Sequence, residues 1–181
     1  MMIDWKNKVT KAVDEKPPSE NSLNQAPGSR SDFDLIDNPS DRLDPLSLKP
    51  ASVIVGIVDG DIPQLFLTKR SDQLEQHSGQ IAFPGGKVEE GESFTEAAIR
   101  EAEEEVGLTL PDYEICGYLD TYETGTGYRI LPVVVFIKSD FIPQIDVNEV
   151  AETFKVPFEF LMDSKNHQLQ SAEWKGMVRK F

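Results

Sequence analysis

The feature that most constrains this chain is a helix predicted over residues 94–106, which combines small apolar residues with a run of acids. Ser93-Phe94-Thr95-Glu96 has the spelling of a capping box, and Gly107 stands where a left-handed C-terminal cap belongs. The positions suited to packing on a sheet are Ala97, Ala98, Ala102 and Val106. The fold must therefore bury one side of this helix and leave its acidic side available.

Three glutamates share that acidic side. Glu101, Glu104 and Glu105 stand at i, i+3 and i+4, and Arg100 is the only basic residue in the helix. Like charges at this spacing destabilise a helix by a few tenths of a kcal/mol per pair. Converging carboxylates are hard oxygen ligands suited to Mg²⁺ or Mn²⁺, whereas the plainer interpretation is a solvated acidic helix. The loop at Phe83-Pro84-Gly85-Gly86 allows close approach of a backbone just before the helix.

The spacing around the helix distinguishes these interpretations. Gly86, five residues, Glu92, seven residues and the run Arg100–Leu108 occupy every fixed position of the Nudix box, which ends in Arg-Glu-aliphatic-x-Glu-Glu-x-Gly-aliphatic. Ala102 is small for its aliphatic position. Seven such residues arise by chance on the order of once in a million chains or less. The chain therefore resembles the Nudix hydrolases.

The resemblance implies a fold and a reaction. The fold is of the α/β (α+β) class, the Nudix fold, in which a mixed β-sheet is sandwiched between helices as an α/β/α sandwich. The reaction is metal-dependent attack of water on a diphosphate. The expected ligands of Mg²⁺ or Mn²⁺ are Gly86, through its backbone, and Glu101, Glu104 and Glu105. The implied catalytic residues are Glu92, Arg100, Glu101, Glu104, Glu105 and Glu149.

The individual roles follow from the same resemblance. Glu92 and Arg100 are expected to brace the loop against the helix as a charge-assisted pair. The general base stays open between Glu92, Glu149 and Glu152. The last two lie in a second helical stretch, predicted over residues 148–162 and interrupted by a proline.

Substrate binding is expected beside the metal site, at Arg70, Gly85 and Gly86. Arg70 is the remaining basic residue near the site and is suited to contact a substrate phosphate. A solvated arginine at the end of a strand is the alternative interpretation of the same residue.

Segments that flank the box look like the coenzyme A pyrophosphatases, a subfamily of the Nudix hydrolases. They are residues 67–71, 74–86, 126–133 and 148–152. This likeness implies hydrolysis of coenzyme A or acyl-CoA to 3′,5′-ADP and (acyl-)4′-phosphopantetheine. Glu75 departs from the subfamily signature, which has arginine there, and its carboxylate would repel a phosphate. ADP-ribose or a nucleoside triphosphate is the alternative substrate, and a non-catalytic Nudix ligand sensor is the alternative function.

Composition limits the partners. The net charge of −14 disfavours nucleic acid and anionic membranes, so a small-molecule nucleotide diphosphate is the expected partner. The oligomeric state, a homodimer included, is left open. No apolar run approaches the ~18 residues of a membrane span. The single cysteine, Cys116, fits a reducing compartment, and a cytoplasmic location is expected.

The chain divides near residue 51. Residues 1–50 hold six of the twelve prolines, and this composition predicts a disordered or loosely ordered N-terminal segment, in which a short helix near residues 5–13 is marginal. Residues 51–181 form the expected Nudix hydrolase domain, for which the resemblance implies that a C-terminal strand and helix are lacking. Strands are predicted over 51–58, 64–69, 80–83, 114–122 and 130–138.

Overall fold

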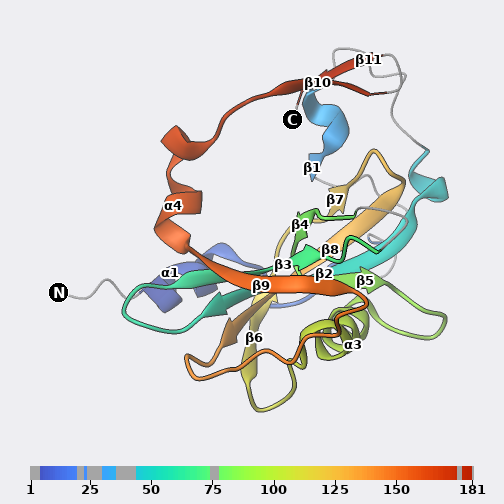
Figure 1. Ribbon diagram of the computed structural model, residues 1–181. Coiled ribbons are helices and arrows are strands. Elements are labelled where there is room, and N and C mark those ends of the chain that lie inside the picture. The colour runs from blue at the N-terminus through green and yellow to red at the C-terminus, as the bar shows by residue number, and fades with distance from the viewer. Residues whose placement is uncertain are drawn as a thin grey trace.

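A computed structural model of the protein (Figure 1) describes residues 5–19, 23, 30–35, 44–73, 78–174 and 177–180. The strands are β1 (Arg30–Ser31), β2 (Lys49–Val58), β3 (Gln64–Arg70), β4 (Ile81–Ala82), β5 (Gly85–Lys87), β6 (Tyr113–Tyr118), β7 (Tyr122–Glu123), β8 (Tyr128–Ile137), β9 (Val150–Pro157), β10 (Ser171–Trp174) and β11 (Met177–Lys180). The helices are α1 (Trp5–Ala12), α3 (Phe94–Val106) and α4 (Phe158–Met162), with short 3₁₀ turns at Asp32–Leu35, Pro45–Ser47 and Ser164–Asn166. None of the helices in these ranges is long and apolar enough to cross a membrane.

Within the described ranges, nine strands form one mixed sheet in the order β1-β7-β8-β2-β3-β4. Strands β5, β6 and β9 pair with β2, β8 and β3, respectively, while β10 and β11 form a separate hairpin. The centre is the parallel pair β2 and β8, which stays in register over ten residues. Both strands are covered on both faces, which explains why their sequences are almost continuously apolar.

Alternate residues of the central strands enter two separate cores. Ile54 and Val58 of β2 belong to a cluster that includes Ala98, Ala102 and Val106 of α3. Val55 and Ile57 face the other way, toward a smaller cluster completed by α1 and α4. The predicted mixed sheet between helices is therefore confirmed, with α3 on one face and the two other helices on the opposite face (Figure 1).

Strand β2 changes partner along its length. Its C-terminal part, Gly56–Val58, pairs with β3, whereas Ala51–Val53 pair with β5. The sheet thus divides beside β2, and the segment at Gly85, predicted as a turn after a strand over 80–83, is itself a short strand. The end of β3 and the start of β5 therefore lie on either side of this division, next to α3.

The helix predicted over 148–162 is wrong for most of its length. Residues 150–157 form β9, which pairs antiparallel with the whole of β3, and α4 begins only at Phe158. The proline read as a helix interruption, Pro157, ends the strand instead. Long-range pairing with β3 outweighs local helix propensity here, and the β-branched residues Val150, Thr153 and Val156 fit a strand.

Part of the segment 1–50 lies on the domain. The marginal helix is present as α1, and Asp14 and Tyr118 exchange two backbone hydrogen bonds of 2.9 Å. Leu23 is buried in the larger core, and its carbonyl accepts from Arg129 Nη1 at 2.6 Å. Residues 1–4, 20–22, 24–29 and 36–43 lie outside the described residues, so the expected loose order of the whole segment stays a prediction.

Candidate active site

Helix α3 begins and ends where its sequence specifies. Ser93 Oγ accepts from the Glu96 amide at 3.2 Å, and Glu96 Oε2 accepts from the Ser93 amide at 2.8 Å, which completes the capping box. At the other end Gly107 has φ of +70° and donates to the Glu103 carbonyl at 2.9 Å. Two defined ends set the rotation and position of the glutamates between them.

Three carboxylates converge at this helix. The side chains of Glu101 and Glu105, from α3, and of Glu149, from the turn before β9, offer oxygens that all lie within 4.8 Å of one another. Three negative charges this close repel strongly in a partly buried site, and a divalent cation relieves that repulsion. This is the donor set that Mg²⁺ or Mn²⁺ prefers.

Glu105 is the most buried member, with 2% of its side chain exposed. Burial raises its pKa to about 7, the neighbouring carboxylates of Glu101 and Glu149 add to the rise, and the Gly85 amide and Arg70 oppose it. The Gly85 amide donates to Oε2 at 3.2 Å, while Arg70 Nη1 lies 3.4 Å from Oε1. Both contacts are long for charge-assisted hydrogen bonds, so the carboxylate has room for a stronger cationic partner.

The loop glycines make close approach to the helix feasible. A Cβ at Gly86 would overlap the carboxylate of Glu101, so any other residue there would displace that side chain. Gly85 has φ of +153°, and a Cβ on it would overlap the Ser52 carbonyl. Burial raises the pKa of Glu101, whereas its hydrogen bond with Arg100 lowers it. The carboxylate of Glu101 is therefore also partly removed from water.

Arg100 forms the brace that the resemblance implied. Its Nε donates to Glu92 Oε1 at 2.9 Å, and Nη2 donates to Glu92 Oε2 and to the Lys87 carbonyl, each at 3.1 Å. Nη1 reaches Glu101 and Glu104, also at 3.1 Å each. These contacts raise the pKa of Arg100, and its hydrogen bonds lower the pKa of Glu92. Arg100 thus joins the loop, the helix and one member of the carboxylate cluster.

The remaining predicted residues are placed differently. Glu104 bonds to Arg100, is 56% exposed and is not one of the three clustered acids, so its role as a metal ligand stays a prediction. Glu152 is 61% exposed and lies 3.5 Å from Lys69 Nζ, outside the cluster. The geometry therefore brings Glu149, and not Glu152, to the site. Glu75 lies outside the described residues.

Arg70 lies at the end of β3, with 27% of its side chain exposed. In the part of the chain that the structure describes, its buried Nε has no hydrogen-bond partner. A buried guanidinium N–H without an acceptor is costly, so the structure around Arg70 leaves one of its donors unsatisfied. Arg70 Nη1 lies beside Glu105, and contact of this guanidinium with a substrate phosphate stays a prediction.

One residue that sequence reasoning missed is Asp146. Its Oδ1 accepts from the Asn148 amide at 2.9 Å, which forms the turn that leads into Glu149. The Asp-Val-Asn spelling of residues 146–148 is a turn signal that could have been recognised, but the predicted helix begins at its last residue, Asn148.

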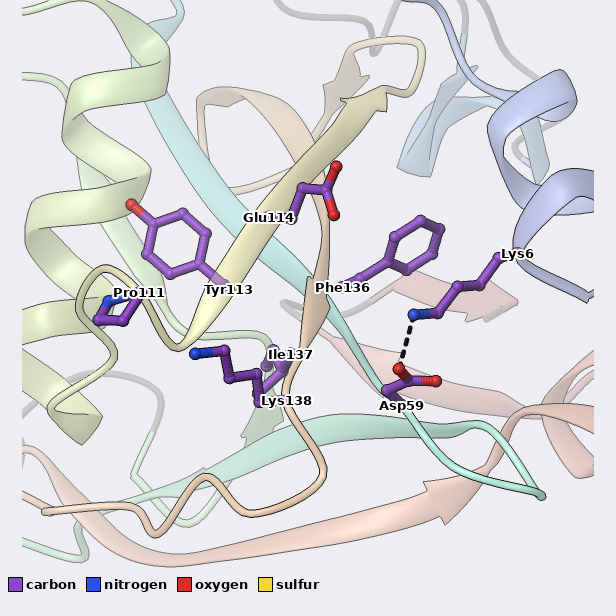
Figure 2. Close-up of a pocket in the computed structure, with 8 residues that line it drawn as sticks. All are labelled: Lys6, Asp59, Pro111, Tyr113, Glu114, Phe136, Ile137 and Lys138. Atoms are coloured by element: carbon purple, nitrogen blue, oxygen red, sulfur yellow. Dashed lines mark hydrogen bonds and ion pairs between the residues drawn. The ribbon is translucent and has the colours of Figure 1, made fainter.

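A separate cavity of about 220 Å³ lies among α1 and the ends of β2, β6 and β8 (Figure 2). Lys6 Nζ and Asp59 Oδ2 are joined there at 2.6 Å, and the ring of Phe136 lies beside them. None of the predicted site residues lines it. Its described lining residues include no cluster of acids like the one at α3.

A known protein family and several known proteins resemble this chain. The NUDIX domain model matches residues 48–175. Proteins named uncharacterized Nudix hydrolase NudL include one from Shigella flexneri, 40% identical over 128 residues that make up 70% of this chain and 66% of the relative. Another, from Enterobacter sp., is 38% identical over 77% of this chain and 73% of its own length. The match thus spans slightly less than two thirds of the Shigella protein.

Solved structures share the fold at lower identity. A binary complex of the C. elegans Ap4A hydrolase has a TM-score of 0.54 at 21% identity, covering 66% of this chain and 88% of that one. RenU, a Nudix hydrolase from M. smegmatis, has a TM-score of 0.53 at 20% identity, covering 64% and 74%. These likenesses concern the fold alone.

Proposed function

This chain belongs to the Nudix hydrolase family, and we propose that it hydrolyses a diphosphate linkage in a nucleotide derivative with the help of Mg²⁺ or Mn²⁺. The observation that carries the proposal is the convergence of Glu101, Glu105 and Glu149 within 4.8 Å, next to a loop glycine that leaves space for them. A buried acid with weak protein partners and two acidic neighbours fits a divalent cation better than it fits water.

The proposed division of labour follows from what each side chain already contacts. Glu101 and Glu105 hold the metal ion, with Glu104 as a further ligand and the Gly86 backbone close by. When bound, such an ion neutralises charge that develops on phosphate oxygens and lowers the pKa of a bound water. Arg70, whose side chain is 27% exposed beside Glu105, donates a guanidinium N–H to a substrate phosphate oxygen.

Glu149 is the proposed general base, which takes a proton from the attacking water as the phosphorus–oxygen bond to the leaving group breaks. Glu92 is less suited, because both its oxygens accept hydrogen bonds from Arg100 and its pKa is lowered. Glu152 is exposed and lies near Lys69, outside the cluster. Glu149 belongs to the carboxylate cluster, and among the described residues no side-chain hydrogen bond holds its carboxylate, so it is available to accept a proton.

Coenzyme A or acyl-CoA is the proposed substrate, with 3′,5′-ADP and (acyl-)4′-phosphopantetheine as products. The support is the likeness of the flanking segments to coenzyme A pyrophosphatases. ADP-ribose or a nucleoside triphosphate is the alternative within the family. A ligand sensor without catalysis is disfavoured because sensing needs no three-carboxylate cage. A cytoplasmic location is part of the proposal, because a chain with one cysteine has no disulfide to gain from an oxidising compartment.

The test is a panel of coenzyme A, dephospho-coenzyme A, ADP-ribose and a nucleoside triphosphate, each with Mg²⁺ or Mn²⁺ and with chelator. Release of 3′,5′-ADP from coenzyme A, lost with chelator, is the expected result. Faster turnover of ADP-ribose or a triphosphate would move the substrate to the alternative. Binding without turnover of any compound would instead favour the sensor.

Glu75 provides a finer test of the substrate. If coenzyme A is the substrate, Glu75→Arg should lower KM and leave kcat nearly unchanged, because an arginine beside a phosphate adds binding to ground state and transition state alike. Such a contact is worth about 1–3 kcal/mol. A wild-type preference for dephospho-coenzyme A would instead point to a substrate without the 3′-phosphate.

A further inference from the structure

The turn that carries Glu149 is attached to the C-terminal end of α3. The Gln144 amide donates to the Val106 carbonyl at 2.9 Å, and the Asp146 amide donates to the Glu105 carbonyl at 3.0 Å. Both carbonyls belong to the last turn of the helix, where intrahelical partners run out. A Cβ at Gly107 would lie 3.0 Å from Gln144 Cβ, so the helix-ending glycine also makes room for this segment.

Asp146 organises the turn with both its side chain and its backbone. Its Oδ1 accepts from the Asn148 amide at 2.9 Å and from Asn148 Nδ2 at 2.8 Å. Its carbonyl accepts from the Glu149 amide at 3.0 Å and from the Val150 amide at 2.8 Å. Asp146 thus accepts four hydrogen bonds within a single turn, and these bonds set the direction in which the Glu149 side chain leaves the backbone.

The other side of Glu149 is held by the end of β3. The Ser71 amide donates to the Glu149 carbonyl at 2.8 Å, and the pairing of β3 with β9 shifts register between Lys69 and Arg70. The residue before that shift, Lys69, pairs with Glu152, and the residue after it, Arg70, pairs with Val150. The register shift therefore lies directly beside the turn. Because the pairing is irregular there, strand pairing alone does not determine the direction of the Glu149 side chain.

We propose that Asp146 is a positioning residue for Glu149, which it holds against the repulsion of Glu101 and Glu105; this rests on the proposed function. Glu105 takes part twice, because its carboxylate belongs to the cluster and its carbonyl anchors Asp146. The position of Glu149 relative to Glu105 is thus set by two successive backbone hydrogen bonds, which the Asp146 side chain stabilises by closing the turn. Misplacement of a reacting group by about 1 Å can cost 100-fold in rate.

The experiment compares Asp146→Ala with Asp146→Asn in the full chain. Alanine removes the acceptor for Asn148, whereas asparagine keeps a carbonyl oxygen in the same place. We expect Asp146→Ala to lower kcat about 10- to 100-fold, with KM within twofold, and Asp146→Asn to stay within threefold of wild type. Loss of a group that orients a metal-site residue commonly costs this much in activity or metal affinity.

A second readout needs no substrate. Mn²⁺ affinity, followed by electron paramagnetic resonance, should weaken about three- to tenfold in Asp146→Ala and recover in Asp146→Asn. Asp163→Ala is the matched control, because Asp163 Oδ1 accepts from the Lys165 amide at 3.0 Å in a turn of the same kind at Ser164–Asn166. That control should leave kcat, KM and Mn²⁺ affinity unchanged.

The possible outcomes distinguish failure of this inference from failure of the proposed function. Wild-type kinetics in Asp146→Ala, or equal losses in both Asp146 variants, would overturn it. Should Asp146→Ala not fold, Asn148→Ala removes the 2.8 Å bond alone and should lower kcat two- to fivefold, and no loss there would also count against it. An active Glu149→Gln with an inactive Glu105→Gln would refute the general-base assignment of Glu149 and, with it, the positioning role, but would leave metal-dependent hydrolysis standing. Full activity in both would refute the proposed function.

Discussion

The two faces of the central sheet are closed in different ways. On one face α3 packs through three small, fully buried side chains. Ala97 and Ala98 have no exposed surface, and Ala102 is 1% exposed. On the other face α1 packs through large, partly buried groups, and Trp5 meets Phe136 edge to face at 5.4 Å between ring centres. Small residues bring a helix backbone close to the sheet, whereas an aromatic pair can shift without losing contact.

This difference matches what each face has to do. Helix α3 must deliver two carboxylates to within a few ångströms of a third, so its position has to be set closely. Helix α1 carries no such group. Its ion pair with the sheet, between Lys6 and Asp59, has both side chains about two-fifths exposed, and pairs of that kind contribute at most about 1 kcal/mol. The packing of α3 is therefore suited to holding the clustered carboxylates in place, whereas α1 covers the opposite face of the sheet.

The largest expected effect is on the chemistry of the α3 face. Glu105→Gln should lower kcat/KM at least 100-fold, because it removes a buried ligand charge. The melting temperature of the metal-free protein should not fall, since the variant also removes repulsion from Glu101 and Glu149. Glu103→Gln, an exposed change on the same helix, is the control and should stay near wild type. A Glu105→Gln enzyme with normal turnover in Mg²⁺ would remove the basis for assigning the site to α3.

Glu104→Gln tests whether an acid of α3 that lies outside the cluster also contributes to catalysis. We expect a loss of about 100-fold in kcat with normal folding, because the family resemblance makes Glu104 a metal ligand. Its present contact is with Arg100 at 3.1 Å, on the exposed side of the helix. Steady-state kinetics with Mg²⁺ and with Mn²⁺ would measure it. Turnover within a few-fold of wild type would show that Glu104 is not a required ligand and would leave Glu101 and Glu105 as the carboxylate ligands.

A pair of core changes compares the packing of the two faces. Ala98→Leu should cost about 1–3 kcal/mol in the free energy of unfolding, because the site has no space for a larger side chain. Val9→Ala, in a partly buried position of α1, should cost about 1 kcal/mol or less. Urea denaturation of both variants measures the difference. Equal costs would show that α1 is packed as closely as α3.

The smallest effect on function is expected from removal of α1. Deleting residues 1–12 should leave kcat/KM unchanged and lower stability by about 1–2 kcal/mol, from the aromatic contact and the exposed ion pair. Cys116, partly buried beside Thr10 with 3.5 Å between Sγ and Oγ1, should react faster with a thiol reagent once α1 is gone. Unchanged thiol reactivity would mean that α1 does not cover this face in solution.

Local parts of the structure could be read directly from the residues. The start and end of α3 depend on Ser93, Glu96 and Gly107, each of which acts within one turn of the helix. The shared face of Glu101 and Glu105 follows from helical geometry alone. The central strands were recognisable too, because burial on both faces makes them continuously apolar. These features rely on neighbours in the sequence.

What escaped sequence reasoning depends on partners far along the chain. Residues 150–157 carry no decisive local signal, and their pairing with β3, eighty or more residues away in sequence, makes them a strand. That pairing, its register shift at Lys69 and Arg70, and the attachment to the end of α3 bring Glu149 to the site while Glu152 stays outside. Helix ends and side-chain periodicity are properties of a few adjacent residues, so the amino-acid order specifies them; which distant acid completes the cluster depends on strand register, which only the folded chain establishes.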